Sequence, residues 1–326
     1  MSAPLITVLI CTHDRADLLE QLLASLDGAR RPADGVQLLV VANACSDRTH
    51  ALLQARVDAG YSDSEVSSRL PLRWVAEPIP GKSQALNRGM QDCQTALVAF
   101  IDDDQRVDPG FLEGLRDAAR DHPEADLFCG RLIPDYDGSE PPWVHDQGRY
   151  RIYPLPTPNF DPGPQAKVLA EGMAMPGGGN IVARLPWLAR VGPFAVDLGP
   201  VGHDLGGAED ADWLRRALRA GARLIYVPAM LQYHYVDPER LKVRYLMHKA
   251  YKRSAASIGM HAVPGTPRGV PAYAWRKLAG YAVAAATALG TARRRFYLIR
   301  SAAALGEIAG HRELARGASS APRTSP

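Results

Sequence analysis

The chain has 326 residues, of which 46% are hydrophobic and 22% charged, so it can bury a large core and divide into more than one domain. Its cysteines (Cys11, Cys45, Cys93 and Cys129) are scattered without short paired spacings, which argues against a zinc site or a disulfide framework and for a reducing compartment. No basic segment precedes the first apolar run, so we interpret this run as a strand and not as a signal peptide.

Positive charge is concentrated towards the C-terminus. Residues 239–316 hold fifteen lysines and arginines against three acids, a net charge of +12, so the rest of the chain carries −9 within the overall +3. The acidic part suits a metal site. The basic part suits an anionic surface such as a membrane leaflet, and because no motif in it resembles a reader of nucleic-acid bases, we expect no nucleic-acid partner.

Strands and helices are predicted to alternate along the first half of the chain. Apolar runs that predict buried strands lie at 5–11, 37–42, 72–76 and 97–101. Each is followed by a stretch with helical periodicity or helix start signals, at 18–26, 47–59, 82–93 and 109–120. This alternation predicts an α/β fold in which helices cover both faces of a parallel sheet. Later strands are expected at 126–134 and 224–227.

Polar side chains follow each of the four early strands. They are Thr12 and Arg15, Asn43 and Asp47, Glu77 and Lys82, and the three acids Asp102, Asp103 and Asp104. The carboxyl ends of parallel strands meet at one edge of a sheet, where ligands bind, so these residues predict a nucleotide-type pocket. The alternative is chance, because loops are polar in general.

The acids at 102–104 repel one another, so folding alone does not favour them. Mg²⁺ or Mn²⁺ would remove that cost, since both take carboxylate oxygens and share their remaining ligand positions with phosphates. The alternative is an acidic turn that caps the next helix. That helix has its own start signal in Asp108 and Pro109, which weakens this alternative.

The second half of the chain is less regular. Residues 134–164 are rich in Pro and Gly and are long for a connection, which favours a functional loop. Its aromatic residues Trp143, Tyr150 and Tyr153 could stack on an acceptor or form a small satellite core.

Glycines and acids mark the region between 177 and 210. The three glycines at 177–179 indicate a close approach of the backbone to a ligand or to another segment, or else a bulge. The glycine-rich stretch 199–207 is a candidate lid. Glu209 and Asp210 open a helix, where acids are also favoured by the helix dipole alone.

From Pro238 the chain is basic and helical. The apolar stretch 275–289 is too short and too rich in alanine for a membrane span, but beside the arginines at 293–295 it could lie in a bilayer interface. The alternative is a helical pair that packs on the catalytic domain.

We expect the chain to contain a catalytic domain at 1–237, with a nucleotide-binding half at 1–125 and an acceptor half at 126–237. A basic helical extension is expected at 238–316 and a disordered tail at 317–326.

Several of these segments together resemble the family 2 glycosyltransferases of GT-A fold. The segments are 6–15, 41–49, 81–89, 99–104 and 209–210, and their order and spacing fit as far as His234. The resemblance implies a Rossmann-like, mostly parallel mixed sheet with a C-terminal helical extension. It also implies a UDP-, GDP- or dTDP-sugar donor, Mn²⁺ or Mg²⁺, inversion at the anomeric carbon and a hydroxyl acceptor on a glycan, lipid-linked or small molecule.

The resemblance also implies residue roles. Thr12, Arg15, Asn43 and Asp47 would line the nucleoside pocket, Lys82 would lie near the diphosphate, and Asp103 would bond locally or to the donor sugar. Asp102, Asp104 and His234 would hold the metal, with Asp210 as the general base and Glu209 beside it. Ala42 stands where many members have an acid that contacts the base, so no strict uridine preference is implied.

The predicted protein is a cytoplasmic glycosyltransferase that can associate peripherally with the inner face of the membrane. One alternative is a sugar-phosphate nucleotidyltransferase, which would carry a glycine-rich basic loop after the first strand, where residues 12–15 contain no glycine. The other is an inactive nucleotide- or carbohydrate-binding module, which the acids at 102–104 and 210 argue against.

Overall fold

The computed structural model describes residues 5–60, 62–64, 67–199, 208–260 and 269–319. The candidate lid, apart from Gly199, and the tail from 320 onwards lie outside these ranges. The chain divides into two compact units, the first formed by 1–135 and 158–235 and the second by 136–157 and 236–326. The domain boundaries expected from the sequence stay predictions, but residues 136–157 group with the C-terminal helices and not with the acceptor half.

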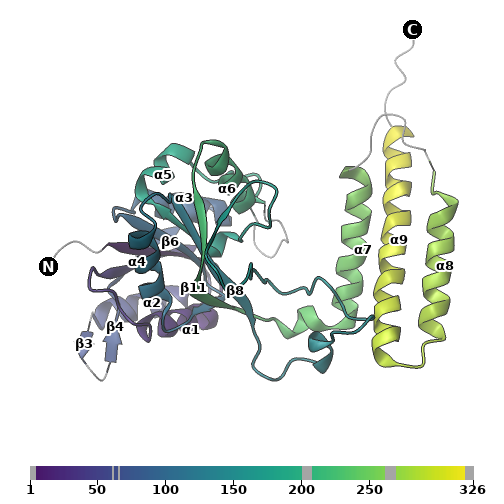
Figure 1. Cartoon of the computed structure of the whole chain (residues 1–326), viewed down its shortest axis with the longest axis horizontal. Coiled ribbons are helices and arrows are strands. Elements are labelled where there is room, and N and C mark those ends of the chain that lie inside the picture. The colour runs from purple at the N-terminus through teal and green to yellow at the C-terminus, as the bar shows by residue number, and fades with distance from the viewer. Residues whose placement is uncertain (1–4, 61, 65–66, 200–207, 261–268, 320–326) are drawn as a thin grey trace, which may run out of the picture. The chain divides into compact units, whose positions relative to one another are not determined.

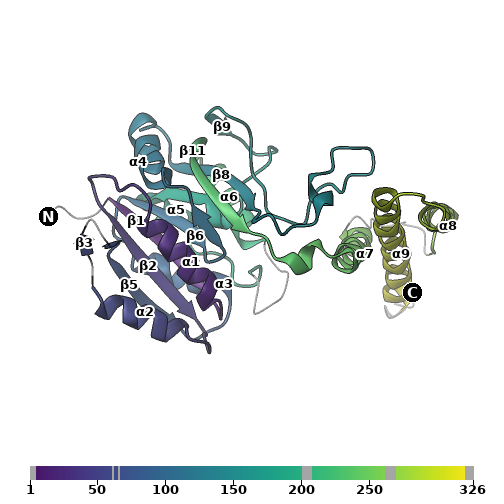
Figure 2. The ribbon, with the colours of Figure 1, turned by 90° about the horizontal axis from the view of Figure 1, so that it is seen from below.

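A mixed sheet forms the centre of the first unit. Within the described residues its strands are β1 (Ile6–Thr12), β2 (Val36–Asn43), β5 (Leu72–Glu77), β6 (Leu97–Asp102), β7 (Gln105–Val107), β8 (Leu127–Asp135), β9 (Lys167–Leu169), β10 (Ile181–Arg184) and β11 (Leu224–Tyr235). Their order is β5-β2-β1-β6-β10-β8-β11-β7, with β9 also pairing with β11. Figure 2 shows β5, β2 and β1 side by side. The early strands pair in parallel, and β10 runs antiparallel to both of its neighbours.

Helices cover both faces of this sheet, as the alternation predicts (Figure 1). One apolar cluster takes its helical residues from α1 (Ala16–Asp27), α2 (Thr49–Asp58) and α4 (Phe111–Asp121). The other takes them from α3 (Lys82–Gln91), α5 (Leu185–Val191) and α6 (Glu209–Arg219). Successive residues of β1, such as Val8 and Leu9, belong to opposite clusters, because side chains alternate across a strand.

Besides β9, three short strands were not predicted from the sequence. β3 (Ser62–Ser64) and β4 (Ser67–Arg69) form a separate pair, and β7 pairs with the end of β11. Strands of three residues are too short to show an alternating pattern, so each is specified by its partner more than by its own sequence.

The second unit contains three long helices, α7 (Val243–Met260), α8 (Ala272–Ala286) and α9 (Thr291–Ser319), with α9 between the other two (Figure 1). Gly306 and Gly310 of α9 let the backbone of α7 come close: a Cβ at these positions would meet the carbonyl oxygens of Tyr251 and Ala255. Since α9 runs to Ser319, the first residues of the tail expected to be disordered are helical.

Residues 136–157 of the second unit pack on α9 through their aromatic side chains. The Tyr150 ring lies 5.8 Å from that of Phe296, and the Arg295 guanidinium lies over Trp143 and bonds Asp146. Trp143 also belongs to a small cluster of its own, so the satellite-core alternative is confirmed for it. In the part of the chain described, no helix combines the length and apolar character needed to cross a membrane.

Candidate active site

The register of the sheet brings the four strand ends together, as predicted. Cys11 pairs with Asp102, Thr12 with Ala42, and Asn43 with Glu77, so the carboxyl ends of β1, β2, β5 and β6 are level. The residues that follow these strands therefore share one edge of the sheet, where open α/β sheets bind their ligands.

Lys82 and Asp102 form an ion pair at this edge. The ammonium of Lys82, in the first turn of α3, lies 2.6 Å from Asp102 Oδ1. Burial alone would lower the pKa of Lys82, but Asp102, Glu209 and Asp210 together hold it above its usual value. Burial alone would likewise raise the pKa of Asp102, and the nearby cations outweigh it, Lys82 foremost. Both groups stay charged, and Lys82 is electrostatically within reach of the acids of α6.

Arg15 holds the other two acids. Its Nη1 lies 3.1 Å from Asp103 Oδ1 and 3.2 Å from Asp104 Oδ2. Asp103 is the more deeply buried of the two, and burial, with repulsion from Asp104, raises its pKa to about 6 although Arg15 opposes the shift. The contacts fit the local role expected for Asp103. They place Arg15 against the acids, and its expected place in the nucleoside pocket stays a prediction.

His234 faces Asp104 through its Nε2 atom. Its Nδ1 lies 2.8 Å from the carbonyl oxygen of Tyr235, which can only accept, so Nδ1 carries the proton of the neutral ring. The lone pair of Nε2 then points at Asp104 Oδ1, 3.3 Å away. Two acceptors in this position need a cation between them or a proton on the ring. A histidine whose other nitrogen donates to a carbonyl is typical of metal sites, so the donor set fits a divalent metal.

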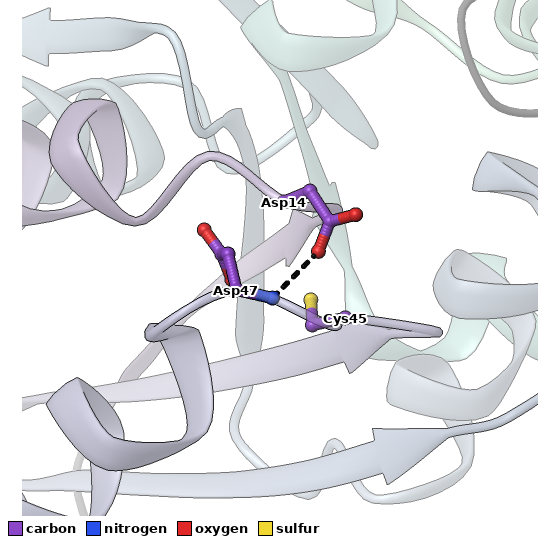
Figure 3. A group of neighbouring side chains, drawn as sticks. All are labelled: Asp14, Cys45 and Asp47. Carbon is purple, nitrogen blue, oxygen red and sulfur yellow. Dashed lines mark hydrogen bonds between the residues drawn. The ribbon is translucent and has the colours of Figure 1, made fainter.

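A different group of three potential metal ligands lies close together. In the described ranges, the one group of three potential ligand side chains whose atoms all lie within 4.8 Å is Asp14, Cys45 and Asp47 (Figure 3). The group does not include the predicted metal ligands, whose assignment stays a prediction.

Backbone bonding explains this group without a metal. Asp14 accepts from the amides of Ser46 and Asp47, and Asp47 accepts from the first amides of α1 and α2. Burial raises the pKa of the Cys45 thiol, which keeps it protonated and a poor ligand. The carboxylates brace the loop and cap two helices.

The side chain of Asn43 forms hydrogen bonds to the backbone of the following turn. Its amide nitrogen donates to the carbonyl oxygens of Glu77 and Ile79, and its oxygen accepts from the Gly81 amide. These bonds fix the turn that delivers Lys82 to the site. Thr12 is buried at the end of β1. The nucleoside-binding roles of Thr12, Asn43 and Asp47 stay predictions.

Gly178 and Gly179 join the two acidic parts of the site. The amide of Gly178 donates to Asp210 Oδ2 at 2.6 Å, and a Cβ on Gly179 would lie 2.5 Å from both Cγ and Oδ2 of Asp102. Neither glycine has a positive φ, so the space and not the backbone conformation excludes a side chain. The predicted close approach to another segment is confirmed, and it brings Asp102 and Asp210 against adjacent residues of one short turn.

Two buried glutamines that the sequence analysis missed support this turn. The amide nitrogen of Gln232 donates to the Gly179 carbonyl at 3.1 Å and to Gln105 Oε1 at 2.8 Å. Asn180 bonds both backbone groups of Gly130 on β8. In the sequence, each of these residues is a polar residue in or next to an apolar strand pattern, and the pattern does not show which group the side chain will bond.

Glu209 and Asp210 differ in their surroundings. Asp210 is half-buried, and both of its oxygens accept backbone amides, from Gly178 and from Ala211. Glu209 is buried, and its Oε2 has no hydrogen-bond partner within the described part of the chain. Burial raises the pKa of Glu209, with Lys82 opposing. Asp210 is thus held in a fixed orientation with lone pairs to spare, as a positioned base requires.

Replacing Gly179 with Ala is expected to lower the catalytic rate about a hundredfold, because the methyl group displaces the Asp102 carboxylate. A shift of about 1 Å in an active site has an effect of that size. The free energy of unfolding should fall by about 1–3 kcal/mol. Gly177→Ala is the matched control, since its Cβ would meet nothing nearer than Asp210 Oδ2 at 3.9 Å. Steady-state kinetics and urea unfolding measure both effects, and equal loss in the two variants would contradict the assignment.

Comparisons with known proteins agree with this geometry. Residues 7–175 match the family described as glycosyl transferase family 2. A relative in Mycobacterium tuberculosis, named pre-mycofactocin glycosyltransferase, is 26% identical over 237 residues, which are 70% of this chain. The match spans 42% of that relative's length.

Two solved structures share the fold. Residues 1–349 of S. aureus TarS, in complex with UDP, align with a TM-score of 0.51 at 14% identity, covering 97% of this chain and 92% of that one. The mannosyltransferase PcManGT from Pyrobaculum calidifontis, in complex with GDP-Man and Mn²⁺, aligns with a TM-score of 0.51 at 16% identity, covering 94% and 88%. The predicted GT-A fold is confirmed.

Proposed function

Because this chain belongs to glycosyl transferase family 2, we propose that it transfers a sugar from a nucleoside-diphosphate donor to an acceptor hydroxyl, with inversion and with help from a divalent metal. The observation that supports the proposal is the 177–179 turn, because Gly178 bonds the Asp210 carboxylate and the adjacent Gly179 packs against Asp102 of the Lys82–Asp102 pair. An inverting displacement at the anomeric carbon needs stabilisation of the leaving diphosphate on one face of the sugar and a base for the acceptor hydroxyl on the other.

The residues on the strand-end side hold the leaving group. Asp104 and His234 would hold the metal, and Asp102 lies in the same acidic turn with its charge compensated by Lys82. A bound divalent metal neutralises charge that develops on the leaving diphosphate. Lys82, which stays protonated, adds a second positive charge at the same edge. In support of such a donor, TarS was solved with UDP and PcManGT with GDP-Man and Mn²⁺.

Asp210 acts on the acceptor side. Its carboxylate takes the proton from the acceptor hydroxyl while the hydroxyl oxygen forms its bond to the anomeric carbon. The bond between the anomeric carbon and the phosphate oxygen breaks, and its electron pair leaves with the diphosphate. The Gly178 and Ala211 amides keep the carboxylate in place during this step. Glu209 is buried beside it at the first residue of α6.

A screen of donor hydrolysis tests the proposal and names the donor. The protein is incubated with UDP-, GDP- and dTDP-sugars in the presence of Mn²⁺, and the released nucleotide is identified. We expect nucleoside diphosphate from at least one donor. A parallel incubation supplies a nucleoside triphosphate and a sugar phosphate, and release of pyrophosphate there would instead identify a nucleotidyltransferase. Nucleotide binding without turnover would identify an inactive module.

A further inference from the structure

The second compact unit contains a cavity of about 670 Å³ that none of the site residues above lines. Its walls come from the 149–156 stretch and from the facing sides of α7 and α9. Five cations surround it: Arg149, Arg151, Lys249, Arg253 and Arg300. No acid is among the described residues that line it.

These cations lack the acidic partners that some other cations of the unit have. Arg295 bonds Asp146, Lys277 bonds Glu307, and Lys242 and Arg244 bond Glu239. Among the described residues, none of the five around the cavity forms an ion pair. Arg151 and Arg300 lie instead over the rings of Tyr153 and Phe296. The pKa of Lys249 is lowered, because nearby protein atoms desolvate its ammonium and because Arg240 and Arg253 repel it. The field at the cavity is therefore positive and uncompensated.

The rest of the lining is apolar. Ile152, Leu155, Leu246, Phe296 and Ile299 contribute to it, and the side chain of Tyr153 is 80% exposed. An inorganic anion alone would leave these walls in contact with water, and an apolar molecule alone would leave the cations without partners. Gly306 and Gly310 allow α7 and α9, which form one side of the cavity, to come into close contact.

We propose that this cavity binds a phosphate ester of an apolar alcohol, with the phosphate among the five cations and the hydrocarbon against the apolar walls. Arginine side chains suit phosphate because they donate in a planar fork. Such a ligand reaches the cavity either as a headgroup in a bilayer or as a free lipid phosphate. The site goes beyond the proposed transfer reaction, since it lies wholly in the second unit and contains none of the residues assigned to transfer.

Calorimetry on the full chain tests the chemistry of the site. The probes are dioctanoyl phosphatidic acid as a monomer, the uncharged dioctanoylglycerol, and inorganic phosphate. We expect the first to bind at least about tenfold more tightly than either of the others, because it alone satisfies both parts of the lining. Equal affinity for inorganic phosphate, or no binding of phosphatidic acid, overturns the proposal.

Two lysines on one helix give a matched pair of variants. Lys249→Gln removes a charge at the cavity, whereas Lys252→Gln removes one from an exposed position on α7 that does not line it. We expect Lys249→Gln to weaken binding about fivefold, the size of one cation's contribution next to anionic lipid, and Lys252→Gln to leave it unchanged. Tyr153→Ala should weaken the binding of phosphatidic acid but not the binding of inorganic phosphate. An equal effect of both lysines would show general surface attraction and overturn the site.

Vesicle flotation then identifies the source of the ligand. Phosphatidylcholine vesicles with and without phosphatidic acid are compared for the parent chain and for Lys249→Gln. Binding that requires phosphatidic acid and falls in the variant identifies a bilayer headgroup. Binding of the monomeric probe without flotation identifies a free lipid phosphate. Nucleotide-sugar hydrolysis, measured on the same samples, reports on the proposed function separately, so failure of one leaves the other standing.

Discussion

Replacing Asp210 with Asn is expected to lower the rate of sugar transfer by about a hundredfold to ten-thousandfold while leaving the affinity for the donor nearly unchanged. The amide cannot accept the proton of the acceptor hydroxyl, and general-base catalysis contributes an effect of this size. Because Lys82 is paired with Asp102 and not with Asp210, the substitution should leave the residues expected to hold the diphosphate in place.

The substitution also has a structural effect that must be separated from catalysis. Asp210 accepts one backbone amide on each oxygen, and Asn retains one acceptor, so one of these bonds is lost at about 1 kcal/mol of folding stability. Thermal unfolding measures this effect. Asp212→Asn is the matched control, because Asp212 lies in the same first turn of α6 and bonds Arg216.

Glu209→Gln distinguishes the two adjacent acids. Glu209 is buried with one oxygen lacking a hydrogen-bond partner among the described residues, so its neutralisation should change stability more than the transfer rate. Single-turnover kinetics with donor and acceptor give the rate, and titration with the nucleotide gives donor binding. Near-normal turnover of Asp210→Asn, or a larger loss in Glu209→Gln, would reassign the base.

The sequence predicted the sheet edge well because that prediction depends on local patterns. Apolar runs that end at Thr12, Asn43 and Asp102 specify where each strand stops, and parallel pairing then makes the ends level. The alternation of strands and helices likewise predicts coverage of both faces, which the two apolar clusters confirm.

What the sequence could not predict depends on contacts between distant segments. Nothing near Gly179 shows that Asp102 will occupy the space beside it, and nothing near His234 shows that its ring will face Asp104. The same limit applies to Asn43 and Asp47, whose polar groups looked available for a nucleotide and instead bond the backbone of neighbouring turns. A side chain's chemistry is visible in the sequence, but whether a partner already occupies it is not.

The second unit shows this limit most clearly. The arginines and aromatic residues at 149–153 and the basic helices were both visible as patterns, but their meeting around one cavity depends on how 136–157 packs on α9. The glycines at 306 and 310, which set the spacing of α7 and α9, look in the sequence like weak points of a helix.

Asp104→Asn is expected to lower the transfer rate about a thousandfold, and EDTA should abolish the activity of the parent chain until Mn²⁺ or Mg²⁺ is restored. The reason is that Asp104 Oδ1 and His234 Nε2 lie 3.3 Å apart, so that one divalent cation could bind both atoms. Stabilisation of the leaving diphosphate by a bound metal contributes several kcal/mol to such a reaction.

Asp103→Asn is the matched control for this prediction. It removes the same charge one position away, from a carboxylate that is buried against Arg15 and is not paired with His234. The concentration of Mn²⁺ that gives half-maximal activity should therefore rise at least about tenfold in Asp104→Asn and in His234→Ala but stay near the parent value in Asp103→Asn. Electron paramagnetic resonance of Mn²⁺ with the nucleoside diphosphate present measures the same binding without turnover. Full activity in chelator, or an equal change in all three variants, would remove the metal from the proposed mechanism and leave Lys82 as the cation at the diphosphate.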